Sequence, residues 1–134
     1  MRFDEAAKTW DDNPVRKERS VLFAKALREV IGANGYTKGM DFGAGTGVTS
    51  FILADELEAI TLIDYSSGMV DQIINKLKDR KVDNLQAFCI DLLNEEGHLS
   101  EKYDIIFSLM TLHHIPDIPK ALGTFQKHLS PGGM

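Results

Sequence analysis

Three segments of this chain carry residue types that could bind a small organic ligand. The first is a glycine-rich run, Asp41-Phe42-Gly43-Ala44-Gly45-Thr46-Gly47. Glycines lack a Cβ, so the backbone can turn sharply there and approach a ligand closely. Asp64 lies 21 residues after Gly43, and Asp91 follows 27 residues later. A carboxylate can accept hydrogen bonds from both ribose hydroxyls, so the pattern predicts a nucleoside site.

Each of these segments follows a short apolar run that predicts a β-strand. The predicted strands are Gly39 to Phe42, Ala59 to Ile63, Leu85 to Ile90, and Tyr103 to Met110. In the last of them Ile105, Ile106 and Phe107 do not alternate with polar residues, which is typical of a strand buried on both faces.

Segments with helical spacing of apolar residues separate these strands. The predicted helices are Pro14 to Ile31, Val48 to Leu57, Ser66 to Leu77, and Ile118 to Leu129. Alternating strands and helices form right-handed βαβ units. The sequence therefore predicts one α/β domain over residues 1–134, with a Rossmann-like, doubly wound, mainly parallel sheet and helices on both faces. Such sheets bind ligands at the carboxyl ends of their strands.

The glycine run departs from the two common pyrophosphate-binding motifs. A dinucleotide fingerprint would have glycine or alanine at position 48, where the chain has Val48. A phosphate-binding loop would contain Gly-Lys followed by Ser or Thr, which this run lacks. An NAD-dependent oxidoreductase is therefore the less favoured alternative.

From about Tyr36 to Met134 the sequence resembles the class I S-adenosylmethionine-dependent methyltransferases. The resemblance is carried by the glycine run, the two aspartates, and the segments 107–117 and 129–133. It implies that S-adenosyl-L-methionine is the cofactor and that a small molecule accepts the methyl group. The cofactor-binding residues that it implies are Asp41, Gly43, Gly45, Gly47, Asp64, Tyr65, Met69, Asp91, Leu92 and Ser108.

The resemblance also implies a role for each part of the site. The glycine run would lie against the methionyl part and Asp64 would hold the ribose. Tyr65, Met69 and the Asp91-Leu92 pair would contact the adenine. Residues 1–13 resemble an amino-terminal arm that covers the cofactor. Methyl transfer requires mainly proximity, orientation and exclusion of water, so no nucleophile is needed.

Several of these residues also have a purely structural interpretation. Asp64 could cap the helix that follows it, Asp91 could hold a turn, and Met69 could belong to the core. Within the arm, Trp10 could anchor the chain rather than face a substrate. His113 and His114 are the candidates for a general base, with packing at a strand end as the alternative. Cys89 is expected to be a buried strand thiol.

The family's sheet usually has seven strands, and this chain ends before the fifth. The carboxy-terminal strands are therefore expected to be missing, which would expose the edge of the strand Tyr103 to Met110. We expect either that the chain self-associates through that edge or that it is a piece of a longer protein. The truncation also motivates an alternative function, namely a module that binds the cofactor but transfers no methyl group alone.

Charge and cysteine content narrow the remaining function classes. Fifteen Lys and Arg against twenty Asp and Glu give a formal net charge of −5, which disfavours a nucleic-acid partner. The basic stretch from Lys76 to Lys81 is expected to be a solvated helix end. Cys89 is the only cysteine, so we expect no disulfide, no metal site and a cytoplasmic location. The sequence shows no secretory signal or membrane-spanning run.

Overall fold

The helices and strands follow one another along the chain in the predicted order. A computed structural model describes residues 14–90, 101–109 and 118–134. Its elements are α2 (Pro14–Asn34), β1 (Lys38–Phe42), α3 (Val48–Leu53), β2 (Ala59–Asp64), α4 (Ser67–Arg80), β3 (Leu85–Cys89), β4 (Ile105–Phe107) and α5 (Ile118–Lys127). Every predicted strand and helix is thus present, although several end at different residues.

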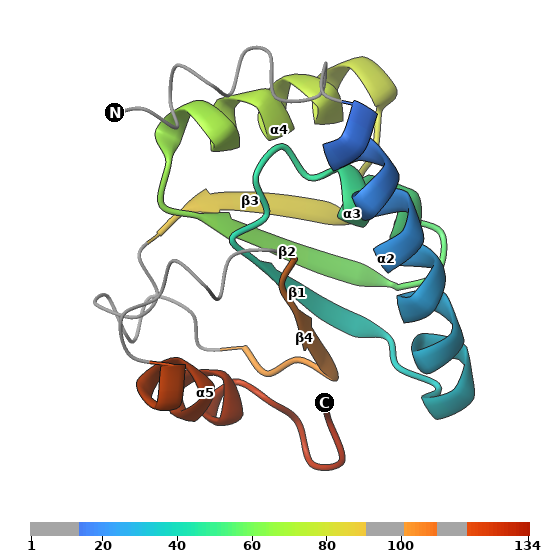
Figure 1. Cartoon of the computed structure of the whole chain (residues 1–134), viewed down its shortest axis with the longest axis vertical. Helices are drawn as coiled ribbons and strands as arrows, with labels where there is room; N and C mark the ends of the chain where they lie inside the picture. Colours follow the sequence, from blue (N-terminus) through green and yellow to red (C-terminus); the bar gives the residue numbers. More distant parts are fainter. Residues whose placement is uncertain (1–13, 91–100, 110–117) are drawn as a thin grey trace.

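The four strands form one parallel sheet in the order β3-β2-β1-β4 (Figure 1). β1 therefore lies between β2 and β4, so the strand order reverses at β1. Lys38 is aligned with Ala59 of β2, and Gly39 with Ile105 of β4. This topology confirms the predicted Rossmann-like sheet.

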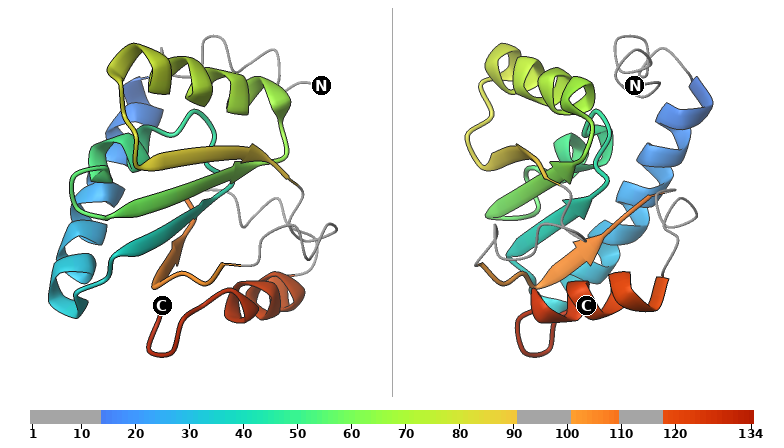
Figure 2. Two further views of the ribbon diagram at one scale, coloured as in Figure 1. Left: turned by 180° about the vertical axis from the view of Figure 1, so that it is seen from behind. Right: turned by 90° about the vertical axis from the view of Figure 1, so that its left-hand side faces the viewer.

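Helices cover both faces of the sheet (Figure 2). α2, α3 and α4 pack on one face around a core that includes the fully buried Leu53, Leu62 and Ile73. α5 packs on the other face, where the rings of Phe42 and Phe125 meet edge to face with centroids 4.8 Å apart. The sheet is therefore doubly wound, as predicted.

α2 is three residues longer than the predicted helix Pro14 to Ile31. The Asn34 side chain donates to the carbonyl of Val30 at 2.8 Å, and Gly35 then ends the helix in the left-handed region, with φ of 64°. Across the described residues, neither α2 nor any other helix is long and apolar enough to cross a membrane.

β4 is shorter than the predicted strand Tyr103 to Met110, and the chain itself covers part of its outer edge. The Tyr103 N–H donates to the carbonyl of His128 at 2.7 Å, and the Ile106 N–H donates to that of Met134 at 2.9 Å. The prediction of an edge exposed along its whole length is therefore wrong over residues 103–106. Residue 110 lies outside the described part of the chain.

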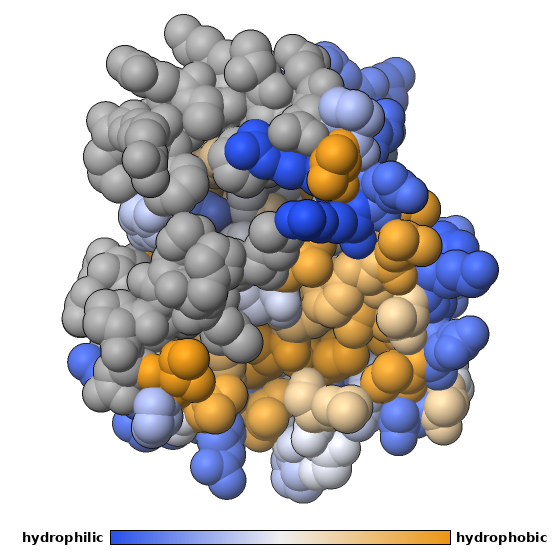
Figure 3. All heavy atoms as spheres, viewed as in Figure 1, coloured by the Kyte–Doolittle hydropathy of each residue, from blue (hydrophilic) through white to orange (hydrophobic). Residues whose placement is uncertain are grey.

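An apolar groove lies beside β4, between α2 and α5. Its volume is about 330 Å³, and it is lined by Phe23, Leu27, Val30, Ile105, Ile106, Phe107, Ser108, Leu122, Phe125 and Met134. Figure 3 shows apolar side chains gathered on this face of the molecule. Leu122 of α5 lines the groove while 54% of its surface stays exposed.

Asp104 ties the start of β1 to the segment that leads into β4. Its Oδ2 accepts hydrogen bonds from the Thr37 N–H at 2.8 Å, the Thr37 hydroxyl at 3.1 Å and the Lys38 N–H at 3.0 Å. The hydrogen bonds from the Thr37 and Lys38 backbone are the main reason why the pKa of Asp104 lies below its usual value.

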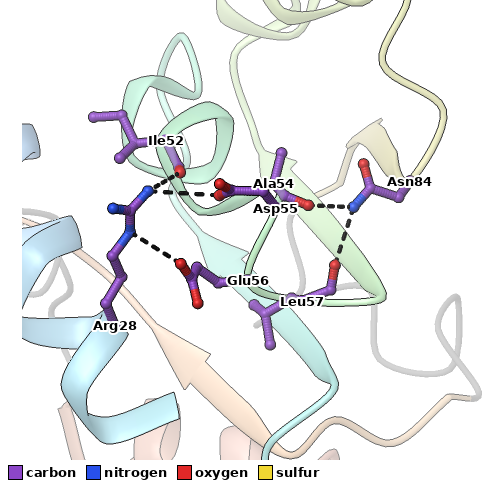
Figure 4. Close-up of polar contacts among 7 residues, drawn as sticks. All are labelled: Arg28, Ile52, Ala54, Asp55, Glu56, Leu57 and Asn84. Atoms are coloured by element: carbon purple, nitrogen blue, oxygen red, sulfur yellow. Dashed lines mark hydrogen bonds and ion pairs between the residues drawn. The ribbon is translucent and has the colours of Figure 1, made fainter. Parts of the chain in front are cut away.

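α3 ends at Leu53, four residues before the predicted end at Leu57, because two side chains from distant segments bind the carbonyls around its end (Figure 4). Arg28 of α2 donates to the carbonyl of Ile52 at 3.0 Å. Asn84, just before β3, donates to the carbonyls of Ala54 at 2.6 Å and Leu57 at 3.1 Å. These bonds satisfy carbonyls at the carboxyl end of α3 and in the segment after it, where a helix end leaves carbonyls without an internal partner.

Candidate functional site

The strand order reverses at β1, and in such sheets ligands bind in a crevice at the carboxyl ends of the strands on either side of the reversal, here β1 and β4. The connection after β1 runs through α3 on one face of the sheet, whereas the helix that comes after β4 in the chain, α5, packs on the other face. The connections that follow β1 and β4 therefore lie on opposite faces of the sheet. The glycine run follows β1, Asp64 ends β2, and Ser108 follows β4. The topology thus brings three of the predicted ligand-binding segments to one edge of the sheet.

The glycine run forms a loop whose glycines all adopt left-handed conformations. Gly43, Gly45 and Gly47 have φ values of 66°, 61° and 80°. Gly47 is also the N-cap of α3, where an added Cβ would lie 2.9 Å from Cδ2 of Leu62. A side chain at position 47 would therefore be both strained and crowded.

Backbone hydrogen bonds hold this loop against β2. The Ala44 N–H donates to the carbonyl of Ile63 at 2.9 Å, and the Gly47 N–H donates back to the carbonyl of Ala44 at 3.0 Å. The Gly45 N–H donates to Oδ2 of Asp64 at 2.9 Å. Three of the loop's N–H groups are therefore used within the protein, whereas a pyrophosphate cradle would point such groups at the ligand.

Asp64 joins the glycine loop to the beginning of α4. Its second oxygen, Oδ1, accepts the Ser66 N–H at 2.9 Å, and the side chain is 8% exposed. The N-cap of α4 is Ser66, whose hydroxyl oxygen accepts the Met69 N–H at 3.3 Å. Asp64 is therefore not the cap of this helix, so the purely structural interpretation of Asp64 is wrong. It sits instead at the junction of the two segments that border the crevice.

A second carboxylate, that of Asp41, is buried beneath the loop. Asp41 is 4% exposed, and the Ser50 hydroxyl of α3 donates to its Oδ2 at 2.8 Å. Burial raises the pKa of Asp41 to about 7; the Ser50 hydrogen bond partly offsets this rise, and the charge of Asp64 adds to it. Close to neutral pH this carboxyl group is thus poised between its protonated and ionised forms.

The other predicted contacts that the structure describes lie around this junction. Tyr65 is 48% exposed directly after Asp64, whereas Met69 on α4 is only 3% exposed. The Ser108 hydroxyl oxygen is buried and has no hydrogen-bond partner among the residues that the structure describes. The three side chains therefore differ in their access to solvent. Tyr65 is open to solvent, whereas Met69 and the Ser108 hydroxyl oxygen are buried.

Cys89 departs from the prediction of a buried thiol. It lies at the end of β3, which is an edge strand, and the residue is exposed. Its thiol donates to the carbonyl of Tyr65 at 3.5 Å. The apolar run that predicted β3 was correct for the strand, but an edge strand has a neighbour on one side only, so its end is less covered.

The remaining predicted site residues lie outside the described part of the chain. These are Asp91, Leu92, His113, His114 and the whole of the arm 1–13 with Trp10. Their assignments stay predictions from the sequence.

Two residues that the sequence analysis did not assign to the site contact it. Ser50 binds Asp41, and Lys76 of α4 donates to the carbonyl of Thr46 in the loop at 2.9 Å. The sequence predicts Lys76 only as part of a basic, solvated helix end. α4 does end at Arg80, but Lys76 lies three residues after the buried Ile73, a spacing that places both on one helix face. That spacing was the signal for its inward position.

Several known proteins similar to this chain are named as methyltransferases. The chain is 26% identical to the trans-aconitate 2-methyltransferase of Deinococcus radiodurans, with 94% of this chain and 47% of that protein covered. It is 26% identical to the ubiquinone biosynthesis O-methyltransferase of Coxiella burnetii, with 98% and 57% covered. The chain thus spans about half the length of these curated relatives.

The fold is similar to that of solved methyltransferase structures. One is the N-methyltransferase NodS of Bradyrhizobium japonicum in complex with S-adenosyl-L-homocysteine, with a TM-score of 0.73 and 24% identity. The comparison covers 92% of this chain and 61% of that one. In addition, the family model described as a methyltransferase domain matches residues 40–134, which include the glycine loop, Asp64 and β4. The chain therefore belongs to the methyltransferase domain family.

Proposed function

We propose that this chain binds S-adenosyl-L-methionine and supports transfer of its methyl group to a small molecule. The observation that carries the proposal is the hydrogen bond between the Gly45 N–H and Asp64, which joins the glycine loop to a carboxylate at the strand-order reversal. Relatives named for methylating trans-aconitate and acting in ubiquinone biosynthesis support a small-molecule acceptor.

In this proposal the loop and Asp64 divide the cofactor between them. Gly43, Gly45 and Gly47 let the backbone approach the methionyl part, above the buried Asp41. Asp64, as an ionised carboxylate, accepts hydrogen bonds from ribose hydroxyls. Tyr65, which is exposed beside it, would lie against the adenine.

The rest of the proposed site comes from the sequence. Met69, Asp91 and Leu92 would complete the adenine contacts, and the backbone near Ser108 would close the crevice. His113 or His114 would take a proton from the acceptor, and the arm 1–13 would exclude water. When bound, the cofactor supplies an electrophilic methyl group on sulfur, so the protein's part is to orient and desolvate the reactants.

The loop geometry makes the NAD alternative less favoured. Pyrophosphate binding relies on unpaired backbone N–H groups at the start of a helix, but Ala44, Gly45 and Gly47 donate theirs within the protein. The net charge of −5 likewise supports the proposal that nucleic acid is not a partner. A cytoplasmic location remains a proposal that rests on the lone cysteine.

The proposal is tested by calorimetric titration of the chain with S-adenosyl-L-methionine, S-adenosyl-L-homocysteine and NAD. We expect the first two to bind and NAD to give no signal. Asp64→Asn keeps the size of the side chain but removes its charge, and hydrogen bonds to charged groups are worth about 1.5–3 kcal/mol. Affinity should therefore fall by about 10- to 100-fold in this variant.

Asp55→Asn is the matched control, since Asp55 is an exposed aspartate that pairs with Arg28 at the other end of the sheet. It should bind the cofactor like the wild-type chain. Absence of binding by a folded wild-type chain would refute the proposal, as would equal affinities of Asp64→Asn and Asp55→Asn. Binding without turnover of any acceptor would favour the alternative of a binding module.

We also propose that two copies of the chain associate through the apolar groove beside β4. The groove is bordered by α2 and α5, and Leu122 projects from its α5 side with half of its surface exposed. In a two-fold symmetric pair the same patch is used by both copies, so each Leu122 would be covered by the other copy's groove.

Sedimentation velocity over a range of concentrations tests this association. The wild-type chain should shift from monomer to dimer as concentration rises, and Leu122→Glu should remain monomeric because the glutamate would have to be desolvated. Leu22→Glu is the control, because Leu22 is similarly exposed on α2 but does not line the groove. A wild-type chain that stays monomeric at all concentrations would contradict the proposal.

A further inference from the structure

The glycine loop is held from outside by a lysine on α4. The half-buried Lys76 donates from Nζ to the carbonyl of Thr46 at 2.9 Å, and the same Nζ lies 5.6 Å from the centre of the Phe51 ring. Thr46 itself is 2% exposed. The contact therefore joins a buried part of the loop to a helix that is 30 residues further along the chain.

This bond acts at the point where the loop turns into α3. The Thr46 carbonyl belongs to the peptide group that ends in the Gly47 nitrogen, and Gly47 is the N-cap of α3. No side chain caps this helix, so it lacks a common means of fixing a helix start. By holding the Thr46 carbonyl, Lys76 sets the orientation of the peptide whose N–H donates to Ala44.

We infer that Lys76 is a positioning residue that keeps the glycine loop in its ligand-binding conformation before the cofactor arrives. The inference rests on the proposed function of the loop. A ligand that binds only one conformation has its apparent affinity reduced by the fraction of the protein in that conformation. Loss of the Lys76 hydrogen bond would lower this fraction and weaken binding without removing any contact to the ligand.

The two forms of the cofactor distinguish this role from a direct effect of charge. S-adenosyl-L-methionine carries a positive sulfonium, whereas S-adenosyl-L-homocysteine carries a neutral thioether. Removal of a positioning residue lowers the affinity for both ligands by the same factor. A cation acting directly on the ligand would repel the sulfonium form, so that its removal would favour S-adenosyl-L-methionine over the neutral product.

Calorimetry with Lys76→Met tests the inference, with Arg80→Met as the control. Arg80 packs on the same Phe51 ring, with Cζ 4.9 Å from its centre, and within the described residues it makes no hydrogen bond to the loop. We expect Lys76→Met to weaken the binding of both ligands by the same factor, at most about tenfold, because one charge-assisted hydrogen bond is lost. The affinity of Arg80→Met should stay within about twofold of that of the wild-type chain. Lys76→Arg keeps a cation at position 76 and should recover most of the lost affinity.

Amide hydrogen exchange gives a readout that needs no ligand. The Gly45 and Gly47 amides should exchange faster in Lys76→Met than in Arg80→Met, since the loop opens more often. Equal affinities and equal exchange rates in the two variants would overturn the inference alone. Failure of the wild-type chain to bind either ligand would overturn the proposed function instead, and unchanged exchange in Lys76→Met would then overturn the positioning role as well.

Discussion

Replacing Gly47 by alanine is expected to lower the free energy of unfolding by about 3 kcal/mol. Two costs combine at this position. The left-handed conformation, with φ of 80°, costs a residue with a Cβ about 1–2 kcal/mol. The new methyl group would also lie 2.9 Å from Leu62, 3.3 Å from Phe51 and 3.4 Å from Ile73, which adds an overpacking cost of about 1–3 kcal/mol.

Gly35→Ala separates these two costs, and both variants are compared by urea unfolding. Gly35 has a similar φ of 64°, but nothing lies within 4 Å of the place where its Cβ would be. This control should therefore lose only the conformational part, about 1 kcal/mol. If Gly47→Ala proved no less stable than Gly35→Ala, the close packing beneath the glycine loop would be disproved.

Asp41 should make the fold less stable as the pH rises from 5 to 8. The pKa of Asp41 is raised to about 7 by burial, from 3.8 for the unperturbed group. An unfolded chain releases this proton at lower pH than the folded chain does, so the free energy of unfolding falls as pH rises from 3.8 towards 7. From pH 5 to pH 8 the loss from this group is roughly 2–3 kcal/mol.

Asp41→Asn isolates the effect, because an amide can still accept the Ser50 hydrogen bond but does not ionise. Urea unfolding at pH 5, 6.5 and 8 should show the variant gaining stability over the wild-type chain as pH rises. Asp104, whose pKa is lowered, is ionised across this range in both folded and unfolded chains and does not contribute. A difference between variant and wild type that does not change with pH would contradict the prediction.

The order and type of every described element could be predicted from the sequence, whereas several ends could not. Apolar runs followed by glycine or aspartate are local signals, and they correctly indicated β1 and β2. The end of α3 depends on Arg28 and Asn84, which lie more than 20 residues away in the chain. No local pattern around Leu53 reveals those partners, so the predicted helix was too long.

The same distinction between local and distant partners applies to the site. The glycine spacing and Asp64 were found because each follows a strand directly. The Ser50 and Lys76 contacts were missed because both residues lie on helices and reach the loop region only through the fold. The exposure of Cys89 depends on β3 being an edge strand, which the apolar run of β3 alone does not show.

The contacts of Asp104 also bear on the entropy of assembling the sheet. Pairing β1 with β2 closes a loop of 21 residues, from Lys38 to Ala59, whereas pairing β1 with β4 closes one of 66 residues, from Gly39 to Ile105. In a flexible chain the longer closure costs about 1 kcal/mol more. Asp104 lies just before β4 and accepts three hydrogen bonds from Thr37 and Lys38 at the start of β1. The strand that is most distant in sequence from its neighbour is thus tied to that neighbour, just before its first residue, by three polar contacts.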